Sequence, residues 1–217
     1  GRPDDPIMNA PAPIGKADYV VVESTYGDRL HEAQDVEAVL GDTIRRTAAR
    51  GGTVLIPAFA VGRAQSLLYA IYRLKQRRAI PYLPVFLNCP MAIDMTDIYL
   101  RHRAEHRLSD AECAGMCKVA TMVRSVEESR ALNAMTYPAV IVSASGMATG
   151  GRVLHHLKTL APDRRNTVVF AGYQAAGTRG ARMVAGESSI RIHGQDIPVR
   201  AEVMSLEGIS AHADARQ

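Results

Sequence analysis

The chain has 217 residues, of which 47% are hydrophobic, so it can form one large α/β domain or two small ones. No stretch approaches the roughly 18 apolar residues of a membrane helix, and residues 1–13 lack the apolar core of a signal peptide. Three cysteines argue against a disulfide framework and favour a reducing, cytoplasmic compartment, while the net charge of +4 permits a polyanionic partner without establishing one.

Short apolar runs predict the strands of a sheet. They are rich in β-branched residues and nearly continuous rather than alternating, which is typical of strands that are buried on both faces. The predicted strands lie near residues 19–23, 53–57, 83–87, 139–143 and 167–171.

Helical patterns lie between most of these runs. Apolar residues recur at helical spacing within residues 36–48, 61–71 and 153–160, and residues 92–133 form a long helical insertion. Near the C-terminus, two apolar stretches, 189–192 and 197–200, flank a polar loop with glycine, which predicts an antiparallel hairpin. The alternation predicts an α/β fold with a mostly parallel, twisted, Rossmann-like sheet and helices on both faces.

Small or polar residues follow every predicted strand. Ligands collect at the carboxyl ends of parallel strands, where free backbone amides of helix N-termini can bind anions. A phosphate-binding role is therefore predicted for residues near these ends: Thr25, Arg63, Ser143, Ser145 and Gly146. Each strand end alone can equally be a turn with a helix cap, and Arg63 can equally cap a carbonyl group. Neither a P-loop nor a dinucleotide-binding glycine motif is present.

Five segments together resemble the β-CASP family of RNA-processing nucleases with a metallo-β-lactamase fold. They are Glu23–Gly27, Ile56–Gln65, Ser143–Met147, Ala171–Gln174 and Ser210–Asp214. Each is weak alone, but they occur in family order across roughly residues 1–214. The family includes RNase J-type enzymes and the eukaryotic pre-mRNA 3′-end endonuclease.

The resemblance implies a catalytic pair and a domain organisation. Glu23 matches the acidic residue of the first family motif, and His212 matches the histidine of the second. Residues 1–18 would lead from a metallo-β-lactamase domain, residues 19–188 would form the β-CASP domain, and residues 189–217 would form a hairpin and return toward the missing domain.

The resemblance also implies two zinc ions in the parent protein. The zinc signature H-x-H-x-D-H is absent, so no metal ligand is assigned here, and this portion alone is expected to be inactive. The implied partners are RNA and the missing domain, and a homo-oligomer is compatible with the sequence. A non-catalytic RNA-binding subunit and, more weakly, an unrelated nucleotide-binding domain are the alternatives. RNA versus DNA and endo- versus exonuclease action stay open.

Histidine and cysteine pairs occur within the insertion at helical spacing. His102 with His106 and Cys113 with Cys117 could form a structural zinc site. Neighbouring arginines favour instead a solvated helix face for the histidines, and a cysteine is often simply buried.

Overall fold

The computed structural model describes residues 2–31 and 34–216. Within these ranges, six strands form one parallel sheet in the order β3-β2-β4-β1-β5-β8, and β6 and β7 form a separate antiparallel hairpin. The strands are β1 (Val54–Pro57), β2 (Val85–Asn88), β3 (Thr121–Met122), β4 (Val140–Ser143), β5 (Thr167–Ala171), β6 (Ser189–Ile192), β7 (Gln195–Pro198) and β8 (Glu202–Leu206). The helices are α1 (Val36–Ala49), α2 (Arg63–Gln76), α3 (Pro90–Arg101), α4 (Asp110–Lys118), α5 (Val126–Leu132), α6 (Val153–Leu160) and α7 (Arg179–Val184), with a 3-10 turn η1 (Arg103–Glu105). The predicted α/β fold with a parallel sheet and a small hairpin is confirmed.

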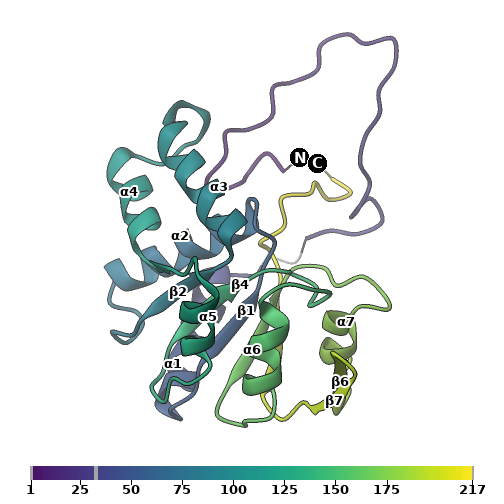
Figure 1. Ribbon diagram of the computed structural model, residues 1–217. Helices are drawn as coiled ribbons and strands as arrows, with labels where there is room; N and C mark the ends of the chain where they lie inside the picture. The colour runs from purple at the N-terminus through teal and green to yellow at the C-terminus, as the bar shows by residue number, and fades with distance from the viewer. Residues whose placement is uncertain (1, 32–33, 217) are drawn as a thin grey trace.

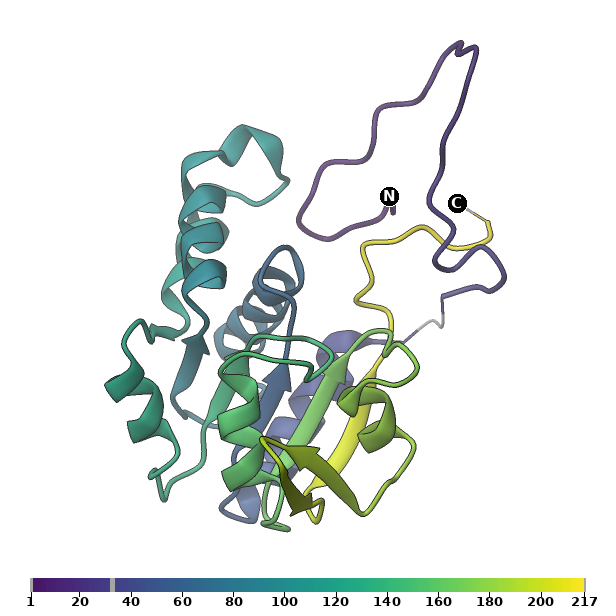
Figure 2. The ribbon, with the colours of Figure 1, turned by 45° about the vertical axis from the view of Figure 1, so that its right-hand side comes forward.

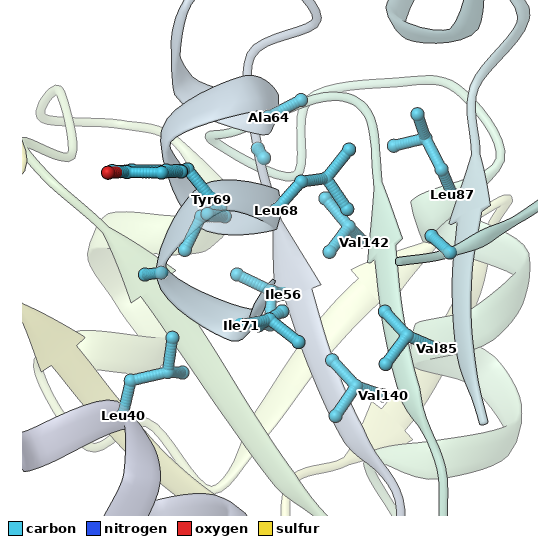
Figure 3. Close-up of a cluster of buried hydrophobic side chains, with 14 of the residues drawn as sticks. Leu40, Ile56, Ala64, Leu68, Tyr69, Ile71, Val85, Leu87, Val140 and Val142 are labelled. Carbon is cyan, nitrogen blue, oxygen red and sulfur yellow. The ribbon is translucent and has the colours of Figure 1, made fainter. Parts of the chain in front are cut away.

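Successive residues of the central strands pack against opposite faces of the sheet. Ile56 and Val142 join a core beneath α1 and α2, where Leu40 and Leu68 cover them (Figure 3). Leu55 and Ile141, the preceding residues of the same two strands, join a second core with α6, α7 and the hairpin. Because both faces are covered, the strands are apolar throughout, as the sequence pattern predicts.

The ribbon shows these two layers of helices (Figures 1 and 2). α1 and α2 lie against one face, and α6 and α7 lie against the other, with α3 and α4 extending beyond the sheet edge. The carboxyl ends of the parallel strands therefore share one side of the sheet. On that side the first described residues meet the last segment of the chain, where the amide of Arg2 donates to the carbonyl of Ala211 at 3.0 Å.

The insertion is less continuous than the sequence pattern predicts. Ser109 with Glu112, and Ser125 with Glu128, form capping boxes that begin α4 and α5. Between them β3 pairs in parallel with β2 and extends the sheet by one strand. Local capping thus divides residues 92–133 into several short elements.

The strand predicted near residues 19–23 is wrong. This segment is extended but belongs to neither sheet, and the side chains of Tyr19 and Val21 are 93% and 100% exposed. A strand needs a neighbour for its backbone hydrogen bonds, and no described strand lies beside this run. The sequence pattern indicates an apolar surface that requires cover, and it does not tell which part of a protein supplies that cover.

The sixth strand, β8, has no counterpart in the predicted sheet. It pairs in parallel with β5 along five residues, from Thr167 opposite Glu202 to Ala171 opposite Leu206. Glu202 accepts hydrogen bonds from Arg46 of α1 and from Arg50, the residue that follows this helix, and these bonds fix the start of the strand. β8 delivers residues 207–216 to the carboxyl side of the sheet.

Candidate active site

Two segments far apart in the sequence meet beyond the carboxyl side of the sheet. The Glu23 carboxylate Oε2 lies 3.1 Å from Nδ1 of His212. Glu23 Oε1 accepts a hydrogen bond from the amide of Ala213 at 3.2 Å, and Oε2 accepts one from the amide of Thr25 at 3.0 Å. The contact that the family resemblance implies between Glu23 and His212 is therefore present, and their chemical roles stay predictions.

The surroundings of Glu23 favour its ionised form. The amide of Thr25 has the largest effect, followed among the favourable contacts by the Thr25 side chain, the amide of Ala213 and the charge of His212, and together they lower the pKa of Glu23 to about 2. Glu23 is thus a carboxylate at neutral pH. A carboxylate beside Nδ1 favours the histidine tautomer that carries its proton on that nitrogen, and leaves Nε2 for other partners.

Other contacts join the same two segments. Nε2 of His31 lies 2.8 Å from the carbonyl oxygen of His212, and the His31 amide donates to Asp214 at 3.0 Å. The ring of Tyr26 contacts both histidine rings, with its centroid 4.9 Å from that of His31 and 6.2 Å from that of His212. Residues 23–31 and 210–214 therefore form one linked unit, which we call the motif junction.

A pocket of about 360 Å³ adjoins His212. Phe59, Val61 and Arg63, which follow β1, line it together with residues of the N-terminal segment. Arg63 donates from Nη1 to the carbonyl of Ala171 at 2.7 Å, and burial lowers the pKa of its guanidinium. Arg63 therefore caps a carbonyl group, as one of the two sequence interpretations expects. Its phosphate-binding role stays a prediction.

The serines after β4 have different environments. Ser143 is 1% exposed, and its hydroxyl donates to the carbonyl of Asn88 at 3.0 Å. The Ser143 hydroxyl therefore already has a partner within the protein, and its phosphate role stays a prediction. Ser145 is partly exposed and accepts from the amides of Thr149 and Gly150, while Gly146 is buried against Phe59. A phosphate role for this loop stays a prediction for Ser145 and Gly146.

A buried polar network beneath this edge escaped sequence reasoning. His156 of α6 is 0% exposed, with Nε2 2.6 Å from Nδ2 of Asn88 and Nδ1 2.6 Å from Oδ1 of Asn133. Arg152 donates to Oδ1 of Asn88 at 2.8 Å. Burial, and next the charges of His155 and Arg152, lower the pKa of His156 to about 4. A neutral His156 therefore holds the end of β2 against α6.

The histidines and cysteines of the insertion do not gather. In residues 2–31 and 34–216, no group of three or more potential metal-binding side chains is present. His106 is buried rather than solvated, with Nε2 3.1 Å from the carbonyl of Tyr99. The thiols of Cys113 and Cys117 point at backbone carbonyls at 3.9 and 3.7 Å, and burial raises the pKa of Cys117 to about 12.

Among the described residues, no helix combines the length and the apolar character that a membrane span requires.

Comparison with known proteins assigns the family. Residues 64–183, more than half of the chain, match the Beta-Casp domain. The chain is 39% identical to Ribonuclease TTHA0252 of Thermus thermophilus over 225 residues, which cover 98% of this chain and 51% of that protein.

Two further relatives come from Methanocaldococcus jannaschii. Transcription termination factor FttA is 35% identical over 93% of this chain and 34% of its own length. An RNase J-like protein is 31% identical over 96% of this chain and 49% of its own length. The chain thus spans between a third and about half of these relatives. With its fold and the matched domain, the chain belongs to the β-CASP family.

Proposed function

We propose that this chain is the β-CASP portion of a zinc-dependent ribonuclease that hydrolyses RNA phosphodiester bonds. The observation that carries the proposal is the contact between Glu23 and His212, whose Oε2 and Nδ1 atoms lie 3.1 Å apart although 189 positions separate them. The similarity to proteins named as ribonucleases supports the reaction class. Because the chain spans only part of each relative, activity is proposed for the parent protein and not for this portion alone.

His212 is the proposed proton donor to the leaving oxygen. The Glu23 carboxylate holds Nδ1, so the imidazole can present Nε2 to the substrate. As the leaving oxygen gains negative charge, His212 transfers its Nε2 proton, and Glu23 stabilises the charged ring before the transfer. Thr25 keeps Glu23 ionised and oriented through its backbone amide.

Zinc does not fit the described residues of this chain, because they contain no group of three potential ligands. In the proposal, the two zinc ions belong to a metallo-β-lactamase domain outside these residues. The only part of the reaction assigned to this chain is the action of the Glu23–His212 pair on the substrate.

The same domain accounts for the exposed apolar run of Tyr19–Val22. Contiguous exposed apolar surface is a mark of an interface, and an extended run of four such residues suits the edge of another sheet. In the proposal, residues 1–18 lead from that domain, residues 19–188 form the β-CASP domain, and residues 189–217 return toward it.

The main alternative is a β-CASP subunit that binds RNA without cleaving it. Single-turnover cleavage of a labelled single-stranded RNA by the intact parent protein separates the two functions. The ribonuclease proposal expects cleavage that His212→Ala lowers about 10²- to 10⁴-fold with unchanged RNA affinity, because a general acid acts in the transition state. Glu23→Gln should lower cleavage less. RNA binding without cleavage by the wild-type protein would establish the alternative.

A further inference from the structure

A second pocket lies on the other side of the motif junction. It has a volume of about 420 Å³, and the residues that matter here are Tyr26, Tyr173, Gln174, Val184 and Glu207. They come from the first family motif, the end of β5, helix α7 and the end of β8. We call it the Tyr173 pocket. It lies at the carboxyl ends of two neighbouring parallel strands, where α/β proteins commonly bind ligands.

The lining of the Tyr173 pocket combines aromatic and apolar side chains with polar and charged ones. The Tyr173 side chain is 51% exposed, and Val184 of α7 is 43% exposed. Gln174 holds the loop in place, because its Nε2 atom donates to the carbonyls of Gly146, Gly172 and Tyr173 at 3.1–3.2 Å. An exposed ring on a fixed loop beside apolar side chains forms a stacking surface for a flat molecule.

The charges of the Tyr173 pocket do not suit a phosphate group. Arg29 lines the pocket, but its guanidinium forms two hydrogen bonds with the carboxylate of Asp28, at 2.8 and 2.9 Å. Glu207 also lines the pocket, and its carboxylate interacts electrostatically with the buried guanidinium of Arg63. A carboxylate repels phosphate and accepts hydrogen bonds from amino groups.

Tyr26 connects the pocket to the candidate active site. It lines the Tyr173 pocket, and its ring centroid lies 6.2 Å from that of His212. A nucleotide whose phosphate reached His212 would therefore have the Tyr173 pocket beside it. Single-stranded RNA exposes unstacked bases that aromatic side chains bind in this way.

We propose that the Tyr173 pocket binds one nucleobase next to the cleaved phosphate, and that it prefers a base with an exocyclic amino group. Tyr173 stacks on the face of the base, Val184 packs against its edge, and Glu207 accepts a hydrogen bond from the amino group. Cytosine therefore binds more tightly than uracil, which presents a carbonyl oxygen at the equivalent position. This inference rests on the proposed function, since it assumes an RNA substrate at His212.

Nucleosides test the pocket without any contribution from phosphate. Saturation-transfer NMR of the 217-residue chain with cytidine and with uridine should give a signal for cytidine that exceeds that for uridine several-fold. Tyr173→Ala should abolish the cytidine signal and Tyr173→Phe should keep it, because phenylalanine retains the ring. Tyr82→Ala is the matched control, since Tyr82 is fully exposed before β2, at the opposite end of the sheet.

Labelled C8 and U8 oligonucleotides test the pocket on RNA, by fluorescence anisotropy with the intact parent protein. Tyr173→Ala should weaken C8 binding about tenfold, the typical loss for one stacked base, and Glu207→Gln should bring the affinities for C8 and U8 together. The nucleobase pocket would be overturned, and the proposed function left standing, by two results together. The Tyr173→Ala and Tyr82→Ala variants would bind RNA equally tightly, and the wild-type chain would give no cytidine signal. Cytidine binding without RNA binding would support the nucleobase pocket and overturn the proposed function. The absence of both kinds of binding would overturn both proposals.

Discussion

Two apolar runs of similar sequence have opposite fates in this protein. Tyr19–Val22 and Val140–Ser143 are both short and rich in valine, and both lead into a family motif. The second is in the middle of the sheet, with every residue buried, while the first is exposed to solvent immediately before the motif junction in the sequence. The extended segment leaves the body of the domain in both views (Figures 1 and 2).

The difference teaches that an apolar run predicts a need for burial and does not identify what provides it. Val140–Ser143 is flanked in space by β1 and β2, which satisfy its backbone groups, and by helices on both faces. Tyr19–Val22 has no such neighbours among the described residues. It is held near the domain by the contacts of Glu23 and Tyr26 that follow it.

The largest expected effect comes from placing the same charge in each run. Val140→Asp should destabilise the domain by about 4 kcal/mol or more, because it buries a carboxylate without a partner in the core. Val21→Asp should change the free energy of unfolding by no more than about 0.5 kcal/mol, since that side chain is fully exposed. Urea unfolding of this chain, followed by circular dichroism, measures both. Equal destabilisation would mean that residues 19–22 are packed in solution.

An intermediate effect comes from the buried His156 in the body of the domain, which makes the free energy of unfolding depend on pH. Because burial lowers the pKa of His156 from 6.5 to about 4, the unfolded chain binds this proton more readily than the folded one. The stabilisation from neutral His156 is complete above pH 6.5 and is lost as the pH falls toward 4, by roughly 3 kcal/mol in total. Urea unfolding between pH 7 and pH 4 should show this slope.

The contribution of His156 is isolated by a matched pair of variants. His156→Gln should remove the additional pH dependence, and His155→Gln, on the exposed face of the same helix, should keep it. An unchanged slope in His156→Gln would show that other groups cause the pH dependence. Because the pKa of His156 is lowered on folding, this residue favours the folded state at the higher pH.

The smallest expected effect concerns the motif junction. The pKa of Glu23 is lowered from 4.5 to about 2, so its contacts are fully formed above pH 4.5 and are lost as the pH falls through 2. Glu23→Ala should accelerate amide hydrogen exchange at Ala213, which donates to Glu23, and leave the global unfolding midpoint unchanged. Exchange at Val142, in the centre of the sheet, is the internal control. Protection at Ala213 that survives the substitution would show that other contacts hold residues 210–214.

Sequence patterns predicted the parts of the fold that depend on continuous burial. The strands at 54–57, 140–143 and 167–171 and the helices α1, α2 and α6 lie where the patterns place them. β8 was not predicted because it is an edge strand with half-buried side chains and no clear apolar run. β3 was not predicted because it has only two residues, too few to form a recognisable apolar run, and they pair in parallel with β2.

The candidate site was less accessible to sequence reasoning. A strand end predicts where Ser143 lies but not that its hydroxyl turns inward to Asn88. His156 looks like a surface histidine beside His155, and only the fold brings Asn88 and Asn133 to its ring. The pairing of Glu23 with His212 followed from the family resemblance, because no local pattern relates positions so far apart in the sequence.

The central claim is that Glu23 and His212 act as one unit in RNA cleavage. A double-mutant cycle of Glu23→Gln and His212→Ala in the intact parent protein, measured by single-turnover cleavage of a labelled RNA, tests it most directly. If Glu23 acts through His212, the double variant should be no slower than His212→Ala alone, because the carboxylate has nothing left to orient. Rate losses that multiply in the double variant would contradict the account and show that the two residues act independently.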